Sequence, residues 1–293
     1  MPSLPSIRLL MPFFGRWPYW MPLFLTSCRF NPTIEWLFYT DCGPLPNLPP
    51  NVELRHMSFD EYCRLVSERL DLNFQPSGPY KLCDIRPAYG LIHRDDLGGV
   101  DFWGWGDVDV IYGQLREYYD PVRLARHDLY STHSRRVSGH LCLVRNTERM
   151  RQAFRHIPDW QALFAEPAHR AVDEKAFSKL FIRHKNFPGP LYRLAGQLNP
   201  WRRRSEFIEA YSTPHGRIPW IDGSYNFPRR WYWDRGQLTS DRDRRHALPY
   251  LHFAVWKKDE WTRQSEPNPN LIATLASEER WTVDQQGFAR MSS

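Results

Sequence analysis

The segment SIRLLMPFFG at positions 6–15 decides the fold class. A short apolar run that ends in glycine is typical of a buried strand. Pro18 then begins a run in which apolar residues recur at helical spacing, so a helix is expected over residues 18–28. The β-branched and aromatic segment IEWLFYT at positions 34–40 predicts a second strand.

The alternation of strand and helix continues toward residue 70. A short third strand is expected at positions 51–57. Ser58 and Glu61 have the spacing of a capping box, and they predict the start of a helix that reaches Leu70. Strands and helices that alternate at these spacings indicate an α/β protein with a βαβ sheet and helices on its faces.

The composition is that of a folded protein. Of the 293 residues, 42% are hydrophobic and 25% are charged, which excludes wholesale disorder. The 13 Trp, 14 Tyr and 17 Phe suit ring-lined pockets and stacking on sugars, but aromatic residues also fill cores. The five cysteines are widely spaced without a C-x-x-C pair, so neither a zinc site nor a disulfide framework is expected.

The net charge is +6, and all but six of the 39 basic residues are arginine. Arginine binds phosphate and carboxylate groups well, so an anionic ligand is one interpretation, and a compositional bias of the source genome is the other. The sequence has no long basic run and no base-stacking motif, so no nucleic-acid partner is expected.

The first 28 residues are apolar but are interrupted by Arg8, Arg16 and five prolines. They contain no uninterrupted signal-peptide core, and the chain has no apolar span of about 18 residues. We therefore expect a cytoplasmic protein with, at most, peripheral contact to the inner face of a membrane.

The segment GDVDV at positions 106–110 holds the strongest chemical signal. Side chains alternate between faces in extended backbone, so Asp107 and Asp109 are expected on one side. Two carboxylates so close together repel each other and favour a cation between them, and oxygen ligands suit Mn²⁺ or Mg²⁺. A lone D-x-D also fits a solvated turn, so its surroundings must decide between the two interpretations.

Those surroundings resemble the sugar-binding region of GT-A glycosyltransferases, where a helix with D-x-x-R-like residues precedes a G-G turn, a hydrophobic strand and D-x-D. The matching stretch runs from KLCDIR at 81–86 through Gly98-Gly99 to Asp109. Here the helix has D-x-R, and the aromatic FWGW at 102–105 replaces an aliphatic strand. The likeness extends to residues 11–15, 136–146, 173–174 and 251–253, and it is closest to small bacterial enzymes of surface-polysaccharide assembly.

The resemblance implies a mixed, mostly parallel GT-A-like central sheet flanked by helices, with an aromatic-rich acceptor-side region toward the C-terminus. One catalytic domain would span residues 1–260, with a nucleotide-sugar-binding half at about 1–135 and an acceptor-side half at about 136–260. The mostly polar residues 261–293 are expected to form a tail or a surface wrap.

The implied activity is transfer of a sugar from a nucleotide-sugar donor to a saccharide or lipid-linked saccharide acceptor, in bacterial polysaccharide or lipopolysaccharide synthesis. Asp109 would bind the metal directly, and Asp107 would bind it through water or hold the ribose and the sugar. The ion would stabilise the charge that develops on the leaving diphosphate. His252 is the candidate third ligand, with a hydrogen-bonded core histidine as the alternative.

Donor binding is implied for residues in three segments. Asp84 would meet the sugar hydroxyls and Arg86 the diphosphate, with Lys81 beside them; the alternative is a charge pair on a helix surface. The base would lie near the loop after the first strand, because ligands of open α/β sheets lie beyond the carboxyl ends of strands. The candidates there are Phe13, Phe14, Gly15 and, with ordinary turn chemistry as its alternative, Asp41.

The acidic pair Asp173-Glu174 would face the acceptor or the sugar. An inverting enzyme would use a carboxylate here as general base, whereas the resemblance slightly favours retention. The alternative is an acidic pair at a helix N-terminus. Arginine clusters, at 202–204, 229–230 and 242–245, could meet an anionic acceptor or phospholipid headgroups, or could simply be solvated.

Two other classes of function stay open at this point. A metal-dependent phosphohydrolase or nucleotidyltransferase would use the same acidic pair in a two-metal centre, but it needs further carboxylates. A basic, aromatic binding module would show steep salt dependence in its binding.

Overall fold

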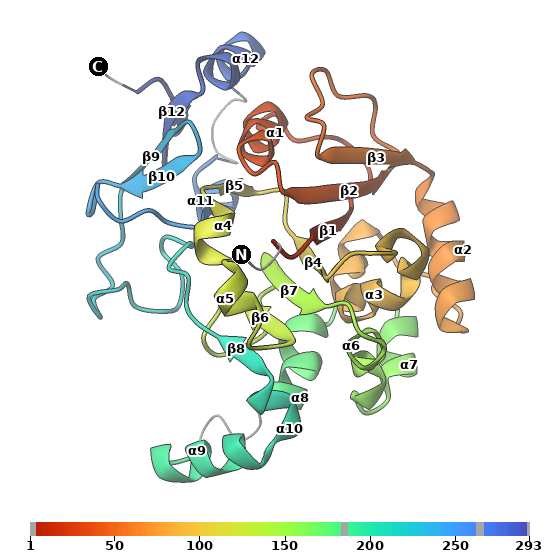
Figure 1. Cartoon of the computed structure of the whole chain (residues 1–293). Coiled ribbons are helices and arrows are strands. Elements are labelled where there is room, and N and C mark those ends of the chain that lie inside the picture. The colour runs from red at the N-terminus through yellow and green to blue at the C-terminus, as the bar shows by residue number, and fades with distance from the viewer. Residues whose placement is uncertain (1–3, 183–186, 262–266, 292–293) are drawn as a thin grey trace.

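The centre of the molecule is a seven-stranded sheet with the order β3-β2-β1-β4-β7-β6-β8 (Figure 1). The computed structural model describes residues 4–182, 187–261 and 267–291. The strands of this sheet are β1 (Ile7–Pro12), β2 (Ile34–Thr40), β3 (Val52–His56), β4 (Phe102–Gly106), β6 (Leu129–Ser131), β7 (Leu141–Arg145) and β8 (Ser205–Phe207).

The sheet is mixed and mostly parallel, as the sequence predicts. Strands β3, β2, β1 and β4 are parallel neighbours, and β8 runs parallel to β6. Strand β7 is antiparallel to both β4 and β6. The first four strands therefore form a Rossmann-like half in which all carboxyl ends lie at one edge.

The two long N-terminal helices form close to where the sequence predicts them, as α1 (Met21–Arg29) and α2 (Phe59–Leu70). The capping box of α2 is complete. The Ser58 hydroxyl accepts the backbone N–H of Glu61 at 3.2 Å, and the Glu61 carboxylate accepts the N–H of Ser58 at 2.7 Å. Two otherwise unsatisfied donors at the start of the helix are thus paired, which fixes where α2 begins.

Short helices cover the rest of the sheet. They are η1 (Pro79–Ala88), α3 (Tyr89–Ile92), η2 (Arg94–Leu97), α4 (Leu115–Tyr118), α5 (Pro121–Leu124), α6 (Glu148–Arg151), η3 (Ala153–His156), α7 (Trp160–Ala165), η4 (Asp173–Phe177) and α8 (Ser178–Phe181).

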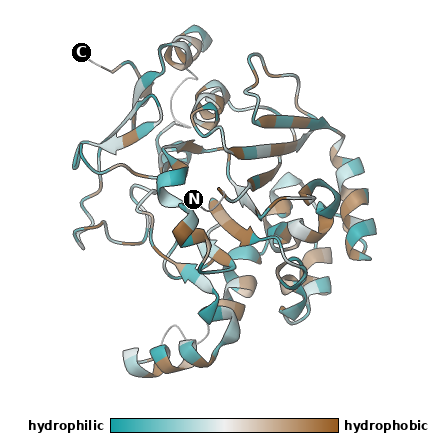
Figure 2. Ribbon diagram, viewed as in Figure 1, coloured by the Kyte–Doolittle hydropathy of each residue, from teal (hydrophilic) through white to brown (hydrophobic). Residues whose placement is uncertain are grey.

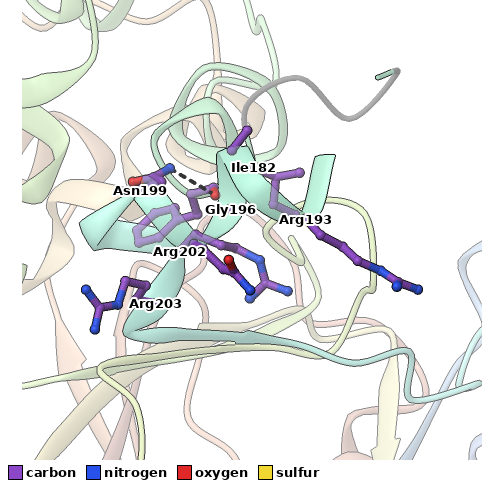
Figure 3. Close-up of a pocket in the computed structure, with 9 residues that line it drawn as sticks. Ile182, Arg193, Gly196, Asn199, Arg202 and Arg203 are labelled. Atoms are coloured by element: carbon purple, nitrogen blue, oxygen red, sulfur yellow. Dashed lines mark hydrogen bonds between the residues drawn. The ribbon is translucent and has the colours of Figure 1, made fainter. Parts of the chain in front are cut away.

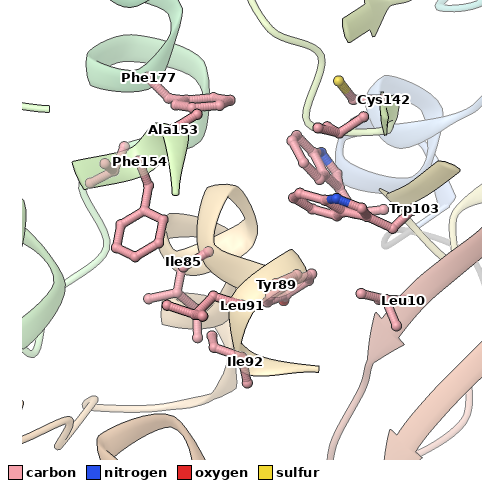
Figure 4. Close-up of a cluster of buried hydrophobic side chains, with 14 of the residues drawn as sticks. Leu10, Ile85, Tyr89, Leu91, Ile92, Trp103, Cys142, Ala153, Phe154 and Phe177 are labelled. Carbon is pink, nitrogen blue, oxygen red and sulfur yellow. The ribbon is translucent and has the colours of Figure 1, made fainter. Parts of the chain in front are cut away.

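The two faces of the sheet belong to two hydrophobic cores. Leu10 points into the core beneath α2, η1 and α3, part of which is drawn in Figure 4. Its neighbours Leu9 and Met11 point into the opposite core, beneath α1, α4 and α5. Figure 2 shows hydrophobic residues along the central strands, as expected for strands that are covered on both faces.

A second sheet, with the order β10-β9-β12-β13, is built from the C-terminal part of the chain (Figure 1). Its strands are β9 (Arg230–Asp234), β10 (Gln237–Ser240), β12 (Arg280–Asp284) and β13 (Gly287–Ala289), and α12 (Pro269–Glu278) packs against α1. Trp281 of β12 is fully buried and stacks on Trp233 of β9, with ring centroids 3.9 Å apart.

The expectation of a polar tail at 261–293 is therefore wrong for the residues described there. Within this segment β12 is an inner strand of the second sheet, and Glu279 pairs with Arg29 of α1 at 2.6 Å. The physical reason is that Trp281 and Val283 alternate with polar residues, a period-two pattern that is typical of a strand. Average polarity hides this alternation.

Two groups of elements remain, one beside the candidate site and one at the far end of the molecule. Strand β5 (Val110–Tyr112) pairs antiparallel with β11 (Tyr250–His252), which leads into α11 (Ala254–Asp259). Helices α9 (Gly189–Leu198) and α10 (Pro200–Arg203) project beyond α8, below the sheet in Figure 1. In the described ranges, no helix has the length and apolar character needed to cross a bilayer.

Candidate active site

A cavity of about 1440 Å³ lies at the carboxyl ends of β1 and β4. Phe13 and Phe14, which follow β1, line one part of it, and Asp107, which follows β4, lines another. Parallel strands place the residues that follow them along one edge of the sheet, which is where open α/β sheets hold ligands. The cavity also reaches Glu209 and His215 in the C-terminal half of the chain.

Asp107, Asp109 and His252 meet in this cavity. A potential ligand atom of each residue lies within 4.8 Å of the others. His252 Nε2 is 4.0 Å from Asp107 Oδ2 and 3.7 Å from Asp109 Oδ1. The structure thus places both aspartates on one side, with His252 beside them.

The β5–β11 ladder brings His252 to the two aspartates, because its register places His252 opposite Val110. A hydrogen bond of 3.1 Å between His252 Nδ1 and the Thr213 hydroxyl orients the ring from the side away from the aspartates. This bond leaves Nε2 for the carboxylates, an arrangement common behind metal-binding histidines. The turn between the aspartates is fixed as well, because the Trp20 indole N–H donates to the Val108 carbonyl at 2.9 Å.

Each aspartate uses one oxygen for a cationic side chain and turns the other toward His252. Arg86 donates to Asp107 Oδ1, and the Lys257 ammonium lies 2.6 Å from Asp109 Oδ2. Burial would raise the pKa of Asp109, but the charges of His252 and Lys257 outweigh it and hold the pKa below its usual value. Asp109 is therefore ionised at neutral pH.

The residues fit a divalent cation. Asp107 Oδ2, Asp109 Oδ1 and His252 Nε2 offer two carboxylate oxygens and one imidazole nitrogen to a common point. Carboxylates suit Mg²⁺ and Mn²⁺, and imidazole is a common ligand of transition metals. The remaining positions around an ion held here would open into the cavity.

Asp173 and Glu174 also line the cavity, and Arg86 contacts both Asp107 and Asp173. Burial raises the pKa of Asp173 to about 7, although Arg86, 3.4 Å away, opposes the shift. Glu174 pairs with Arg136 at 3.1 Å. Gly139 lies between Arg86 and Glu174. Its carbonyl accepts a hydrogen bond from Arg86 at 2.7 Å, and a Cβ at this position would be 3.1 Å from Glu174 Oε1.

Among the cavity residues that were not singled out from the sequence, two lie directly beside the three candidate ligands. Lys257 reaches Asp109 from α11, and His140 stacks on His252 with ring centroids 4.2 Å apart. Burial and the neighbouring charge of His252 lower the pKa of His140 well below its usual value, so its ring is neutral. The signal for Lys257 was its place five residues after the candidate ligand His252, whereas His140 has no local signal.

Lys81 and Asp84 are not placed as donor-binding residues. Their side chains are only 1% and 0% exposed and pair with each other at 2.8 Å. Asp84 also accepts the backbone N–H groups of Arg170 and Val172, at 2.8 and 2.9 Å. The pair braces residues 168–172 beneath the cavity wall, because the side chains of Lys81 and Asp84 face the interior while other residues of η1 line the cavity.

The candidates around the first strand divide in two. Phe13 and Phe14 line the cavity, and Phe13 stacks on Trp17 with centroids 5.2 Å apart. Asp41 is exposed, and its carboxylate accepts the backbone N–H of Gly15 at 2.7 Å. Gly15 has a φ of +107°, a conformation that favours glycine. Asp41 and Gly15 therefore shape the loop that carries the two phenylalanines.

A comparison with protein families gives one match. The model of the family of unknown function DUF6625 matches residues 9–279. The chain belongs to this family. The DUF6625 chain has no match among curated proteins.

Solved structures similar to the DUF6625 chain include glycosyltransferases. Mouse xyloside xylosyltransferase 1 matches with a TM-score of 0.48 and 10% identity, over 85% of this chain and 98% of that one. The galactosyltransferase LgtC, bound to donor and acceptor sugar analogues, matches with a TM-score of 0.42 and 9% identity, over 92% and 96%. Likenesses at this level assign no activity to the chain.

Proposed function

We propose that the protein is a metal-dependent glycosyltransferase that uses a nucleotide-sugar donor. One observation carries the proposal: Asp107, Asp109 and His252 converge at the carboxyl edge of the sheet, inside a cavity that Arg86 and Lys257 also reach. In this arrangement a divalent cation held by the three ligands would lie beside two cationic side chains. A nucleoside diphosphate is an anionic ligand that such a set of groups would recognise.

The cavity is large enough for both a donor and an acceptor. Its volume of about 1440 Å³ exceeds the roughly 300–1,000 Å³ of a typical small-molecule pocket. Phe13 and Phe14 supply an apolar wall, which suits a nucleoside base, next to the polar cluster. The donor would thus extend from β1 toward the aspartates, with the acceptor entering on the side of Glu209 and His215.

The charged side chains have separate tasks in this mechanism. A bound Mn²⁺ or Mg²⁺ supplies Lewis-acid stabilisation of the leaving diphosphate. Asp107 and Asp109 would hold it, and His252 would complete the set with its ring oriented by Thr213. Arg86 and Lys257, which pair with the aspartates, are in reach to exchange part of those contacts for phosphate oxygens.

We assign Asp173 and Glu174 to the sugar and acceptor. A carboxyl with a pKa of about 7 is suited to accept a proton from an acceptor hydroxyl near neutral pH, or to donate a hydrogen bond to the sugar. The first role belongs to inversion. The resemblance in the sequence favours retention, in which Asp173 would hold the sugar.

The biological setting is proposed on the resemblance in the sequence. It is bacterial polysaccharide or lipopolysaccharide synthesis in the cytoplasm, with a saccharide or a lipid-linked saccharide as the acceptor. The glycosyltransferase assignment does not depend on this setting.

A thermal-shift panel of nucleotide sugars, with and without Mn²⁺, tests the proposal. A ligand that binds only the folded state raises the melting temperature by mass action, so the correct donor should raise it in the presence of the metal. Asp109→Asn should abolish the shift. Asp95→Asn is the matched control, because Asp95 is exposed and pairs with Arg69 on the surface.

Activity is then measured with the donor that the panel selects. Mn²⁺-dependent release of nucleoside diphosphate, lost in Asp109→Asn and retained in Asp95→Asn, is the expected result. Full activity of the double variant Asp107→Ala/Asp109→Ala in the presence of a chelator would overturn the proposal. Release of inorganic phosphate without sugar transfer would indicate a phosphohydrolase instead.

A further inference from the structure

Helices α9 and α10 form a projection that presents apolar side chains to solvent. Leu191, Leu194 and Leu198 of α9 are 53%, 53% and 76% exposed. Their spacings of three and four residues place them on one face of the helix. Figure 1 shows α9 at the end of the molecule opposite to the second sheet, away from β5 and α11.

The same projection carries only positive charge. Every charged residue between positions 187 and 204 is an arginine: Arg193, Arg202, Arg203 and Arg204. Arg204 is compensated by Asp128, with which it forms a hydrogen bond of 2.9 Å. Arg193 and Arg203 are exposed, and Arg202 is half-buried.

A groove of about 340 Å³ is lined by the end of α8 together with α9 and α10, and it combines apolar and cationic side chains. Arg193, Arg202 and Arg203 line it, together with buried Phe181 and Ile182. Figure 3 shows the guanidinium groups of Arg193 and Arg203 extending outward from opposite sides of this groove. An apolar floor beneath a cationic rim suits an anionic amphiphile, in which a phosphate is joined to hydrocarbon.

We propose that the α9–α10 projection docks on a bilayer that contains anionic phospholipid. Leu191, Leu194 and Leu198 enter the interfacial layer, and the arginines meet lipid phosphates. A short helix with an apolar face and basic flanks is the usual form of such a contact. A second copy of the chain is a poorer occupant, because a helix of ten residues is about 15 Å long and offers little of the roughly 800 Å² per partner that stable interfaces bury.

The test is flotation of the full-length protein with vesicles of phosphatidylcholine alone or with added phosphatidylglycerol. Wild-type protein should float only with the anionic vesicles, and high salt should weaken the binding. Arg193→Gln/Arg203→Gln should weaken it more than tenfold, since each arginine near such a surface contributes about fivefold. Leu191→Gln/Leu194→Gln/Leu198→Gln should abolish it.

Matched controls distinguish binding by this surface from non-specific binding by exposed apolar or basic residues elsewhere. Leu48→Gln/Val122→Gln/Ile208→Gln replaces three other exposed apolar residues, and Arg94→Gln/Arg235→Gln replaces two exposed arginines elsewhere. Both controls should bind like wild type, and circular dichroism should show all variants folded. The proposal fails if wild-type protein does not float with anionic vesicles, if it floats equally with neutral ones, or if the α9 variants bind unchanged.

Light scattering in the absence of lipid measures the oligomeric state and so tests self-association as the alternative. A dimer that the leucine variant converts to monomer, with vesicle binding unchanged, would overturn the proposal in favour of self-association. Binding to lipid and metal-dependent donor binding are measured separately, so either can fail without the other.

Discussion

Two charge clusters lie near each other in the sequence, one buried in the interior and the other facing the cavity. In the first, Lys81 and Asp84 pair in the interior, and Asp84 uses both oxygens on partners from its own chain. In the second, Asp107 and Asp109 each keep one oxygen turned toward His252 and the cavity. The comparison teaches that carboxylate oxygens left without a hydrogen-bond donor among the described residues, and turned into a cavity, mark the site that can take a ligand.

The largest expected effect is on the saturated cluster. Asp84→Ala leaves the Lys81 ammonium buried without its partner and removes the acceptor for the N–H groups of Arg170 and Val172. We expect the free energy of unfolding to fall by about 3–5 kcal/mol. Urea denaturation measures it. If Asp84→Ala were as stable as wild type but failed to bind donor, the two clusters would have been assigned the wrong way round.

Asp109→Asn should lower activity strongly and stability only slightly, the reverse of Asp84→Ala. Loss of one carboxylate from the cation site should lower kcat/KM for donor hydrolysis by about 100- to 1,000-fold, a size typical of lost electrostatic stabilisation. Stability should change far less than in Asp84→Ala, because the amide still fits the space and Lys257 is 40% exposed to water. Steady-state kinetics with Mn²⁺, paired with denaturation of the same sample, makes the measurement. Equal losses of stability in the two variants would contradict the comparison.

The pH dependence of stability should report Asp173. Its pKa is about 7 in the folded protein, against a usual value of 3.8. Between about pH 4 and 7 the folded state therefore holds a proton that the unfolded state releases. The free energy of unfolding should fall as the pH rises through this interval, by up to about 1.4 kcal/mol per pH unit.

Asp173→Asn should remove this contribution, because the amide does not titrate. Urea denaturation of both proteins from pH 4.5 to 7.5 gives the two slopes. Identical slopes in the variant and the wild type would mean that Asp173 does not hold a proton there.

The smallest expected effect is on kcat/KM, and it comes from the close packing of Glu174 and Arg86 around Gly139. In Gly139→Ala the added Cβ would lie 3.1 Å from Glu174 Oε1 and 3.2 Å from Arg86 Nη1, so both side chains must shift by a few tenths of an ångström. We expect about a threefold loss in kcat/KM, because small misplacements near reacting groups slow catalysis. Gly98→Ala, with no atom within 4 Å of its added Cβ, is the control and should retain full activity.

The parts of the fold that local patterns specify could be predicted from the sequence. The capping box at Ser58, the first strands and the pair Asp107 and Asp109 each depend on residues within a few positions of one another. The fate of Asp84 could not be predicted in this way, because residues far along the chain, Arg170 and Val172, supply its partners.

The same limit explains what was missed in the candidate site. His140 reaches the site through β7 and the central sheet, so nothing near it in the sequence announces its role. The C-terminal segment is a different case, because the alternation of Trp281 and Val283 was available and average polarity concealed it. Period-two patterns in short segments therefore outweigh overall composition.

The pairing of β5 with β11 also determines at which stage of folding the candidate site can form. Asp109 and Lys257 are 148 positions apart, and His252 enters beside them only after β11 has paired. On a ribosome, the nascent chain would expose its aspartates long before the histidine and the lysine emerge from the exit tunnel. Contacts so distant along the chain form late in folding, so fragments that stop short of β11 should have a formed β1–β4 core but no assembled cation centre.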